Sequence, residues 1–207
     1  MNYEMKNIYG DSRKRTGHFG ITYRGVNMVK CPFDYVLLQM LIHNIKPDLI
    51  IEIGTHTGGS ALYIADILET IGGKGVIHTI DLKEKKYDTS VETHNRIKLF
   101  FGGYQSYDIK NADGFNNILV IDDGSHNYTD VISAFDKFNS LISSGGYYVI
   151  EDGIVSDLGL ANFFDGGPLL AIDKILHDYN GFIIDNEYCN FFGENYTFNP
   201  NGYLKKI

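Results

Sequence analysis

ILVIDDGSH at residues 118–126 and YYVIEDG at residues 147–153 each place carboxylates directly after a short apolar run. Carboxylates at the ends of two buried strands carry a large desolvation cost unless a positive charge meets them. If the two runs are neighbouring strands of one sheet, their acids converge on one pocket. A hard divalent cation bound by oxygen ligands is the simplest explanation for such a pocket.

The sequence around these two runs alternates short apolar segments with segments of helical periodicity. Strands are expected at 49–53, 76–80, 97–101, 118–121 and 147–150, and helices from Pro32 to near Pro47 and at 60–71, 131–142 and 168–179. This alternation predicts an α/β fold with a doubly wound, mostly parallel sheet and helices on both faces. Segments 182–184 and 196–198, with Tyr203-Leu204 near the end, are predicted to form a terminal antiparallel strand pair.

Length and composition limit the class of protein. A chain of 207 residues is long enough for one α/β domain and short for two. Residues 1–30 are polar and contain glycine breakers, so we interpret them as an N-terminal extension or lid on a single domain at 31–207. A net charge of −8 argues against a nucleic-acid partner. Because no signal peptide or membrane-length apolar run is found, we expect a cytoplasmic protein without a membrane partner.

A glycine-containing loop follows the first predicted strand of the sheet, in the sequence GTHTGGS at residues 54–60. Gly54 and Gly58 would let the backbone pass close to a ligand, and the start of the next helix offers free N–H groups to an anion. A plain structural turn is the alternative. Asp81 ends the second strand, where an acid accepts the ribose hydroxyls of NAD or of S-adenosylmethionine. The loop departs from G-x-G-x-x-G, which counts against NAD.

The acids at the two later strand ends indicate the chemistry. Asp123 and Glu151 are separated by 28 positions (151 − 123), the span of a strand end, a helix and a return strand. Together with Asp152 they would suit Mg²⁺, and His126 lies where an imidazole could take a proton from a hydroxyl at the metal. The alternative is that Asp123 caps a helix, His126 lies at the surface and the later acids form a turn.

Asp122 has no single assignment from the sequence. We group it with the cofactor-binding residues. Two alternatives stay open: it turns away and holds loop backbone, or it is the metal ligand in place of Asp123.

These residues resemble a known family, the class I S-adenosylmethionine-dependent O-methyltransferases of the cephalosporin hydroxylase type, which are metal-dependent sugar or antibiotic O-methyltransferases. The similarity extends from about Tyr23 to Gly153. Its marks are Arg24-Gly25-Val26, Cys31-Pro32-Phe33-Asp34, PDLIIEIG at 47–54, Gly58-Gly59-Ser60, Gly103-Tyr104-Gln105-Ser106, Asp123-Gly124-Ser125-His126 and Glu151-Asp152. The position of Tyr104 is often acidic in the family, and the C-terminal third matches nothing familiar.

The resemblance implies a Rossmann-like class I methyltransferase domain that uses S-adenosylmethionine and Mg²⁺, with a sugar or other small polyhydroxylated metabolite as acceptor. It implies Mg²⁺ ligands at Asp123, Glu151 and Asp152 and a general base at His126, where the similar catechol-type enzymes use a lysine. The residues that it assigns to the cofactor are Glu52, Gly54, Ser60, Asp81 and Gln105. Relatives of this type also suggest a homo-oligomer.

Three other functions compete with this interpretation. A non-catalytic cofactor-binding module would have no need for three acids together with His126. An NAD-dependent oxidoreductase would explain Glu52, Gly54 and Asp81 but not the acid cluster. A metal-dependent hydrolase would explain the acid cluster but not the glycine loop.

Overall fold

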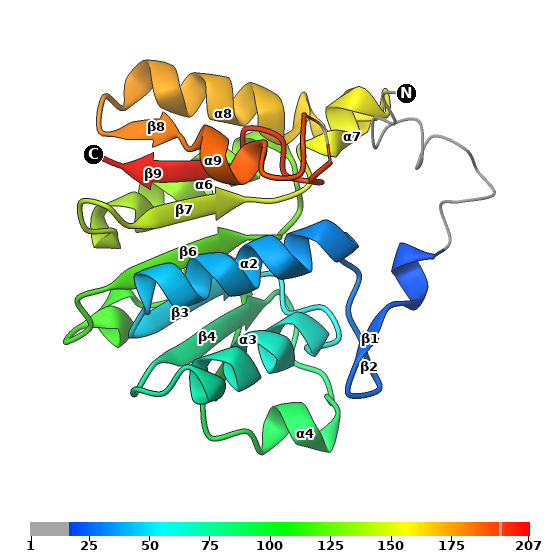
Figure 1. Cartoon of the computed structure of the whole chain (residues 1–207), viewed down its shortest axis with the longest axis vertical. Helices are drawn as coiled ribbons and strands as arrows, with labels where there is room; N and C mark the ends of the chain where they lie inside the picture. Colours follow the sequence, from blue (N-terminus) through cyan, green and yellow to red (C-terminus); the bar gives the residue numbers. More distant parts are fainter. Residues whose placement is uncertain (1–16, 195) are drawn as a thin grey trace.

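The computed structural model describes residues 17–194 and 196–207 (Figure 1). The strands are β1 (Thr22–Tyr23), β2 (Val26–Asn27), β3 (Leu49–Ile53), β4 (Val76–Asp81), β5 (Ile97–Phe101), β6 (Ile118–Asp122), β7 (Tyr147–Ile150), β8 (Phe182–Ile184) and β9 (Tyr203–Lys206). The α-helices are α2 (Pro32–Ile45), α3 (Gly59–Thr70), α4 (Thr89–Glu92), α5 (Gly103–Ser106), α6 (Tyr128–Phe138), α7 (Ile154–Asp157), α8 (Gly167–Asp178) and α9 (Asn186–Cys189). Short 3₁₀ turns are η1 (His18–Gly20), η2 (Ile109–Ala112), η3 (Asn139–Leu141) and η4 (Ala161–Phe164). Part of the predicted lid, residues 1–16, lies outside the described residues.

Seven strands form one sheet in the order β5-β4-β3-β6-β7-β9-β8. The first five of these are parallel, and β9 runs antiparallel to both of its neighbours. The predicted α/β class, the mostly parallel sheet and the antiparallel C-terminal pair are therefore confirmed. In the pairing of β3 with β6, Ile53 lies beside Asp122, so the carboxyl ends of these strands meet at one rim.

Helices cover both faces of the sheet, which explains why its central strands are buried and mostly apolar. On one face, α2 and α3 pack against β3 and β6 through residues such as Leu41 and Ile64. On the other face, α6 and α8 pack through Phe135 and Ile172. Figure 1 shows α2 and α3 lying side by side across the strands. The two apolar layers hold the strand ends in a fixed register.

The strand predicted at 196–198 is wrong, because the C-terminal pair consists of β8 and β9. The backbone at 196–198 is instead held by the buried carboxylate of Asp34 on α2. Asp34 accepts hydrogen bonds from the Thr197 hydroxyl and from the Phe198 N–H, the latter at 3.0 Å. A backbone amide bonded to a side chain cannot also join a strand ladder.

The short hairpin of β1 and β2 leads into a segment that crosses the start of α3 in close contact. The Thr57 hydroxyl donates a hydrogen bond to the Asn27 carbonyl. A Cβ atom on Gly59 would lie 2.2 Å from the same carbonyl oxygen. Glycine at this position therefore allows the N-terminal segment to approach the rim of the sheet.

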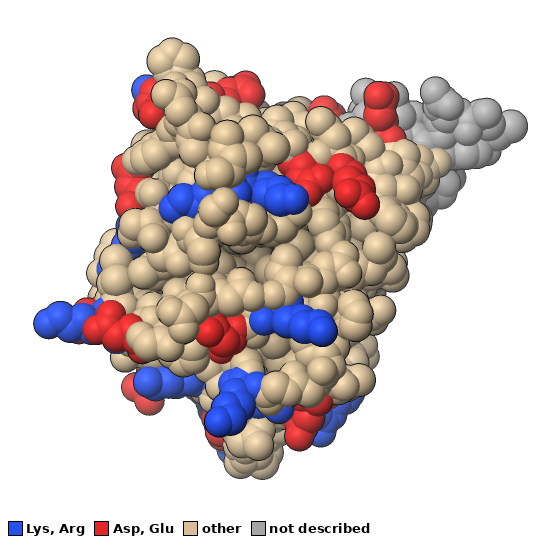
Figure 2. Space-filling model, turned by 60° about the vertical axis from the view of Figure 1, so that its left-hand side comes forward, with Lys and Arg blue, Asp and Glu red and all other residues tan. Residues whose placement is uncertain are grey.

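On the face shown in Figure 2, lysine and arginine side chains are interspersed with aspartate and glutamate. Such a mixed surface differs from the basic face that a phosphate-backbone binder needs. Among the described residues, no helix has both the length and the apolar character that crossing a membrane requires.

Replacing Gly59 by alanine should displace the N-terminal segment, because the new Cβ atom meets backbone rather than a flexible side chain. We expect Gly59→Ala to lower the free energy of unfolding by about 1–3 kcal/mol in urea denaturation. Gly181→Ala is the matched control, since no atom lies within 4 Å of its added Cβ, and its change should stay within about 0.5 kcal/mol. Equal effects of the two variants would contradict this prediction.

Candidate active site

A cavity of about 490 Å³ opens at the carboxyl ends of the central strands. The chain moves from β3 to β4 on one side and reaches β6 on the other, so β3 marks the point at which the strand order reverses. Ligands of open α/β sheets bind at such a point. Loops after β3, β4 and β6, together with residues 27–29 and 103–105, line the cavity. Its volume suits a nucleotide-sized ligand.

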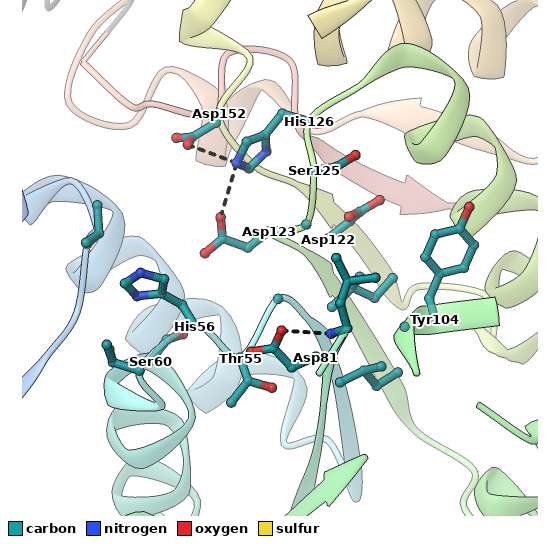
Figure 3. Close-up of a pocket in the computed structure, with 18 of the residues that line it drawn as sticks. Thr55, His56, Ser60, Asp81, Tyr104, Asp122, Asp123, Ser125, His126 and Asp152 are labelled. Carbon is teal, nitrogen blue, oxygen red and sulfur yellow. Dashed lines mark hydrogen bonds and ion pairs between the residues drawn. The ribbon is translucent and has the colours of Figure 1, made fainter. Parts of the chain in front are cut away.

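The cavity has two chemically different ends (Figure 3). Asp81 and Ser60 lie toward one end, whereas Asp123, His126 and Asp152 point toward one another at the other end. A ligand that spans the crevice would therefore contact the single carboxylate of Asp81 at one end and the cluster of Asp123, His126 and Asp152 at the other.

Asp81 is fixed in an ionised form at the end of β4. Its Oδ1 accepts the Leu82 N–H at 2.7 Å, and its Oδ2 accepts Lys85 Nζ at 2.9 Å and the Tyr87 hydroxyl at 3.2 Å. Burial opposes ionisation, but these donors outweigh it and hold the pKa of Asp81 below its ordinary value. A carboxylate has further lone pairs, so Asp81 can still accept hydroxyl groups from a ligand.

Glu52 lies behind the cavity wall rather than on its surface. Its side chain is fully buried and accepts hydrogen bonds from the Ser60 hydroxyl and, at 2.6 Å, from the Thr79 hydroxyl. Burial raises the pKa of Glu52 to about 7, although both hydroxyls favour the charged form. In this structure Glu52 positions Ser60, which does line the cavity.

The two glycines that the sequence assigned to the cofactor differ in position. Gly54 lines the cavity with φ of 104°, and a Cβ atom there would lie 2.0 Å from the Asp123 carbonyl oxygen. Gly58 instead faces the side chains of Val91 and Tyr87 and is not part of the cavity lining. Gly54 thus allows the loops after β3 and β6 to touch, while Gly58 allows close packing on α4.

Gln105 and Asp122 both line the cavity, as does the predicted cofactor residue Ser60. Asp122 is buried, and the Tyr148 hydroxyl lies 3.5 Å from its Oδ2. Burial raises the pKa of Asp122 to about 7, with His126 opposing the shift. Its side chain is separate from the group formed by Asp123, His126 and Asp152.

Asp123, His126 and Asp152 bring one ligand atom each to within 4.8 Å of one another. His126 Nε2 lies 3.9 Å from Asp123 Oδ1 and 3.4 Å from Asp152 Oδ2 (Figure 3). Burial raises the pKa of Asp123, and Lys30 and His126 oppose that shift. Two carboxylates that face one another beside an imidazole fit a hard divalent cation.

Backbone conformation is unusual at this end of the cavity. His126 has φ of 58° and Asp152 has φ of 59°, although neither residue is glycine. Left-handed conformations of this kind cost of order 1 kcal/mol each and concentrate at functional sites. The two residues whose side chains meet at 3.4 Å are therefore both held in disfavoured backbone conformations.

Lys30 belongs to this end of the site and was missed in the sequence. Its side chain is 2% exposed, and its Nζ forms an ion pair with Glu151 and lies 3.4 Å from Asp123 Oδ2. Burial opposes the charge of Lys30, but Glu151 and Asp123 outweigh it and raise the pKa. Burial raises the pKa of Glu151 to about 7, against the effect of Lys30. Glu151 is therefore paired with Lys30, next to Asp123.

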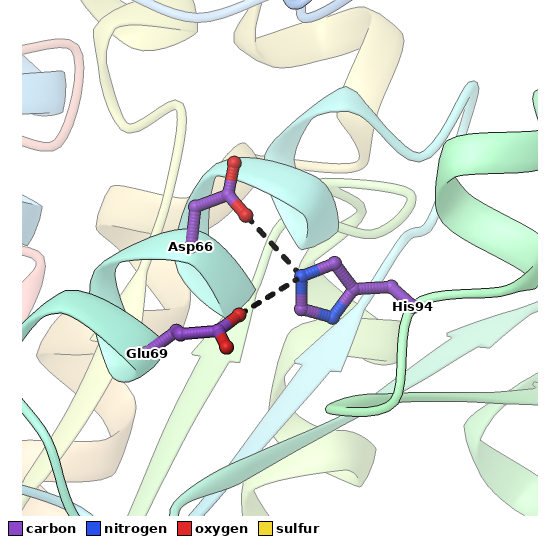
Figure 4. A group of neighbouring side chains, drawn as sticks. All are labelled: Asp66, Glu69 and His94. Atoms are coloured by element: carbon purple, nitrogen blue, oxygen red, sulfur yellow. Dashed lines mark hydrogen bonds and ion pairs between the residues drawn. The ribbon is translucent and has the colours of Figure 1, made fainter.

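A second group of potential ligands lies away from the cavity (Figure 4). His94 Nε2 is 3.2 Å from Asp66 Oδ1 and 3.8 Å from Glu69 Oε2. The Arg96 N–H donates to His94 Nδ1 at 3.2 Å, so a neutral imidazole carries its proton on Nε2. The nitrogen that faces the carboxylates then has no lone pair to offer a metal.

Asp66 serves instead as an anchor for the N-terminal hairpin. Its carboxylate accepts the Tyr23 hydroxyl at 2.9 Å and the Arg24 guanidinium at 3.0 Å and 3.2 Å. These contacts fasten β1 to α3, while the segment that follows β2 reaches the cavity.

In sequence, the chain is similar to known O-methyltransferases. The family model described as Rhamnosyl O-methyltransferase/CmcI matches residues 17–207. The rhamnosyl O-methyltransferase of Mycobacterium tuberculosis (strain ATCC 25618 / H37Rv) is 30% identical over 192 residues, which cover 88% of this chain and 77% of that protein. The Mycobacterium leprae (strain TN) protein of the same name is 25% identical over 189 residues, covering 88% and 82%.

Solved structures agree on the fold. The structure described as cmcI-N160 SAH has a TM-score of 0.71 at 18% identity, and the match covers 92% of this chain and 84% of that one. The structure described as cmcI-D160 Mg-SAM has a TM-score of 0.64 at 19% identity, covering 91% and 77%. This chain therefore shares the arrangement of its sheet and helices with these structures, although the sequence identity is low.

The buried Glu52 makes the stability of the protein depend on pH. Its folded pKa of about 7 lies above the ordinary value of 4.5, so between these pH values only the unfolded chain loses the proton. The free energy of unfolding therefore falls as pH rises through this window and levels off above it. We expect the advantage of wild type over Glu52→Gln to shrink by about 3 kcal/mol between pH 4.5 and pH 8 in urea unfolding.

Glu84→Gln serves as the control, because Glu84 is exposed. Parallel pH dependences for wild type and Glu52→Gln would rule out the buried titration.

Proposed function

The chain belongs to the rhamnosyl O-methyltransferase/CmcI family of S-adenosylmethionine-dependent O-methyltransferases, and we propose that it is Mg²⁺-dependent and methylates a hydroxyl of a sugar or similar small polyhydroxylated molecule. The sugar acceptor follows from the rhamnosyl O-methyltransferases that the chain resembles along 88% of its length. The observation that carries the rest is the convergence of Asp123, His126 and Asp152 at the end of the cavity opposite Asp81.

Asp81 would bind the ribose hydroxyls of the methyl donor, because its ionised carboxylate lines the cavity at the end of β4. Ser60 and Gln105 line the same cavity and would contact the donor, while Gly54 lets the loops approach it. Glu52 would act through Ser60, to which it is hydrogen-bonded. S-adenosylmethionine, when bound, supplies a methyl group on a positively charged sulfur.

Asp123 and Asp152 would hold the metal, with Glu151 as the third carboxylate at the same rim. Mg²⁺, when bound, orients the acceptor hydroxyl and makes it more acidic. His126 would take the hydroxyl proton at Nε2, the atom that faces both carboxylates. The walls of the crevice would hold the acceptor oxygen and the methyl group of the donor in line.

Residues 17–30 are the described part of the proposed lid. Asn27, Met28 and Val29 line the cavity, and Phe19 reaches it as well. Covering the site in this way would exclude water from the reacting groups. The cytoplasmic location and the homo-oligomeric state stay predictions.

Titration calorimetry with S-adenosylmethionine, S-adenosylhomocysteine and NAD, each with and without Mg²⁺, tests the proposed donor. We expect binding of both sulfur compounds and none of NAD. Asp123→Asn should keep the binding of S-adenosylhomocysteine but lose Mg²⁺ binding, because it removes a negative charge from the cluster. Its methyl transfer to rhamnose-containing glycosides should fall at least ~100-fold. Mg²⁺-dependent turnover at the wild-type rate in Asp123→Asn would overturn the metal assignment.

His126→Ala should lower kcat by about 10²–10⁴-fold, the usual contribution of a positioned general base. Affinity for S-adenosylmethionine should stay within a few-fold, because His126 lies at the end of the cavity away from Asp81. The matched control is His43→Ala, an exposed histidine on α2. Steady-state kinetics and calorimetry on the same preparations separate the two effects, and equal losses in turnover and donor affinity would indicate a structural histidine instead.

A further inference from the structure

Lys30 is a buried cation that lies directly against two of the proposed metal-holding carboxylates. It comes from the segment between β2 and α2, and 121 positions separate it from Glu151 along the chain. Its side chain is 2% exposed, and that of Glu151 is 6% exposed. No part of Lys30 lines the cavity, so its ammonium reaches the carboxylates from behind the wall.

Lys30 and His126 lie next to different oxygens of Asp123. The ammonium pairs with Glu151 and lies 3.4 Å from Oδ2 of Asp123. The other oxygen of Asp123, Oδ1, points toward His126 at 3.9 Å. Asp123 is therefore shared between Lys30 on its buried side and the open cluster on its cavity side.

The charges of this group leave room for one divalent cation. Asp123, Glu151 and Asp152 carry three negative charges when ionised, and Lys30 supplies one positive charge. The remaining two negative charges equal the charge of one Mg²⁺ ion. Without either cation, these three carboxylates, of which Glu151 is buried, would repel one another without compensation.

We propose that Lys30 is a built-in counter-ion of the metal centre, which stabilises the metal-free protein and at the same time weakens the binding of the divalent cation. This inference rests on the proposed metal-dependent function. The ammonium and the metal are bound to the same carboxylates, so each reduces the affinity of the site for the other. A lysine suits this role because it is a compact point charge on a flexible stem that can adjust when a second cation enters.

Lys30→Met tests the proposal, since methionine keeps much of the side-chain volume and removes the charge. After chelation of all metal, the variant should melt roughly 5–15 °C below wild type, because Glu151 then lacks its partner. In titration calorimetry with saturating S-adenosylhomocysteine, the variant should bind Mg²⁺ about tenfold more tightly or better, because the repulsion between two neighbouring cations is gone. The stabilisation by Mg²⁺ in thermal melts should grow accordingly.

Two further variants separate charge from packing. Lys30→Arg keeps the positive charge and should bind Mg²⁺ within about threefold of wild type, on the same Coulombic argument. Lys174→Met removes an exposed lysine on α8 and should change neither measurement. Adding Glu151→Gln to Lys30→Met removes both partners and should recover part of the loss in the metal-free melting temperature.

Each result has one meaning for the proposal. Tighter Mg²⁺ binding by Lys30→Met, with a lower melting temperature of the metal-free variant, supports the counter-ion role. Unchanged or weaker Mg²⁺ binding overturns it and makes Lys30 a structural ion-pair partner only, as does tighter binding by Lys30→Arg. An absence of Mg²⁺ binding in both wild type and Lys30→Met overturns the proposed metal dependence itself, and the counter-ion role with it.

Discussion

The energetic cost of burying carboxylates at the strand ends determines how the rest of this molecule is arranged. Asp123 and Glu151 directly follow two adjacent strands, Glu151 buried and Asp123 partly buried, and ions in such a place need a partner of opposite charge. Lys30 is that partner, and it comes from a segment far away in sequence. The same ion pair therefore fixes the course of the chain immediately before it, where Asn27 and Met28 line the cavity. This ion pair acts together with the contacts of Thr57 and Gly59 with Asn27 in holding the segment at the cavity.

The crevice also depends on two close backbone approaches that only glycine permits. Gly54 brings the loop after β3 against the Asp123 carbonyl, and Gly59 brings α3 against the Asn27 carbonyl. The first contact holds the loop after β3 against the loop after β6, and the second holds the end of β2 against the start of α3. The glycine loop therefore has a structural function of its own, in addition to leaving space for a ligand. The sequence left two interpretations of this loop open, a structural turn and a ligand-binding loop. Gly54 fits both, because it touches the loop after β6 and also lines the cavity.

The sequence predicts the sheet well because its central strands are short, mostly apolar runs that stop at an acid or a glycine: Gly54 after β3, Asp81 at the end of β4, Asp122 at the end of β6 and Glu151 after β7. Asp81 and Asp123 could be located for that reason, since register follows from where each run stops. Lys30 could not, because a single lysine in a polar segment has no pattern and its partner lies 121 positions away. Glu52 was assigned to the cofactor through the family resemblance, and in this structure two hydroxyls enclose its side chain behind the cavity wall. The strand at 196–198 was predicted wrongly for the same reason as Lys30 was missed. The segment is held by a distant residue, the buried carboxylate of Asp34.

The position of the carboxylates around His126 also bears on the direction in which charge moves during methyl transfer. In the proposed mechanism, the donor would lose its positive charge as the methyl group leaves sulfur, and the proton released by the acceptor would give His126 a positive charge. That charge would arise 3.4 Å from Asp152 and 3.9 Å from Asp123, in a partly buried site where such interactions are strong. In the proposed centre, the single charge of Lys30 leaves two of the three carboxylate charges for a divalent cation, and the imidazolium of His126 would form beside the same carboxylates.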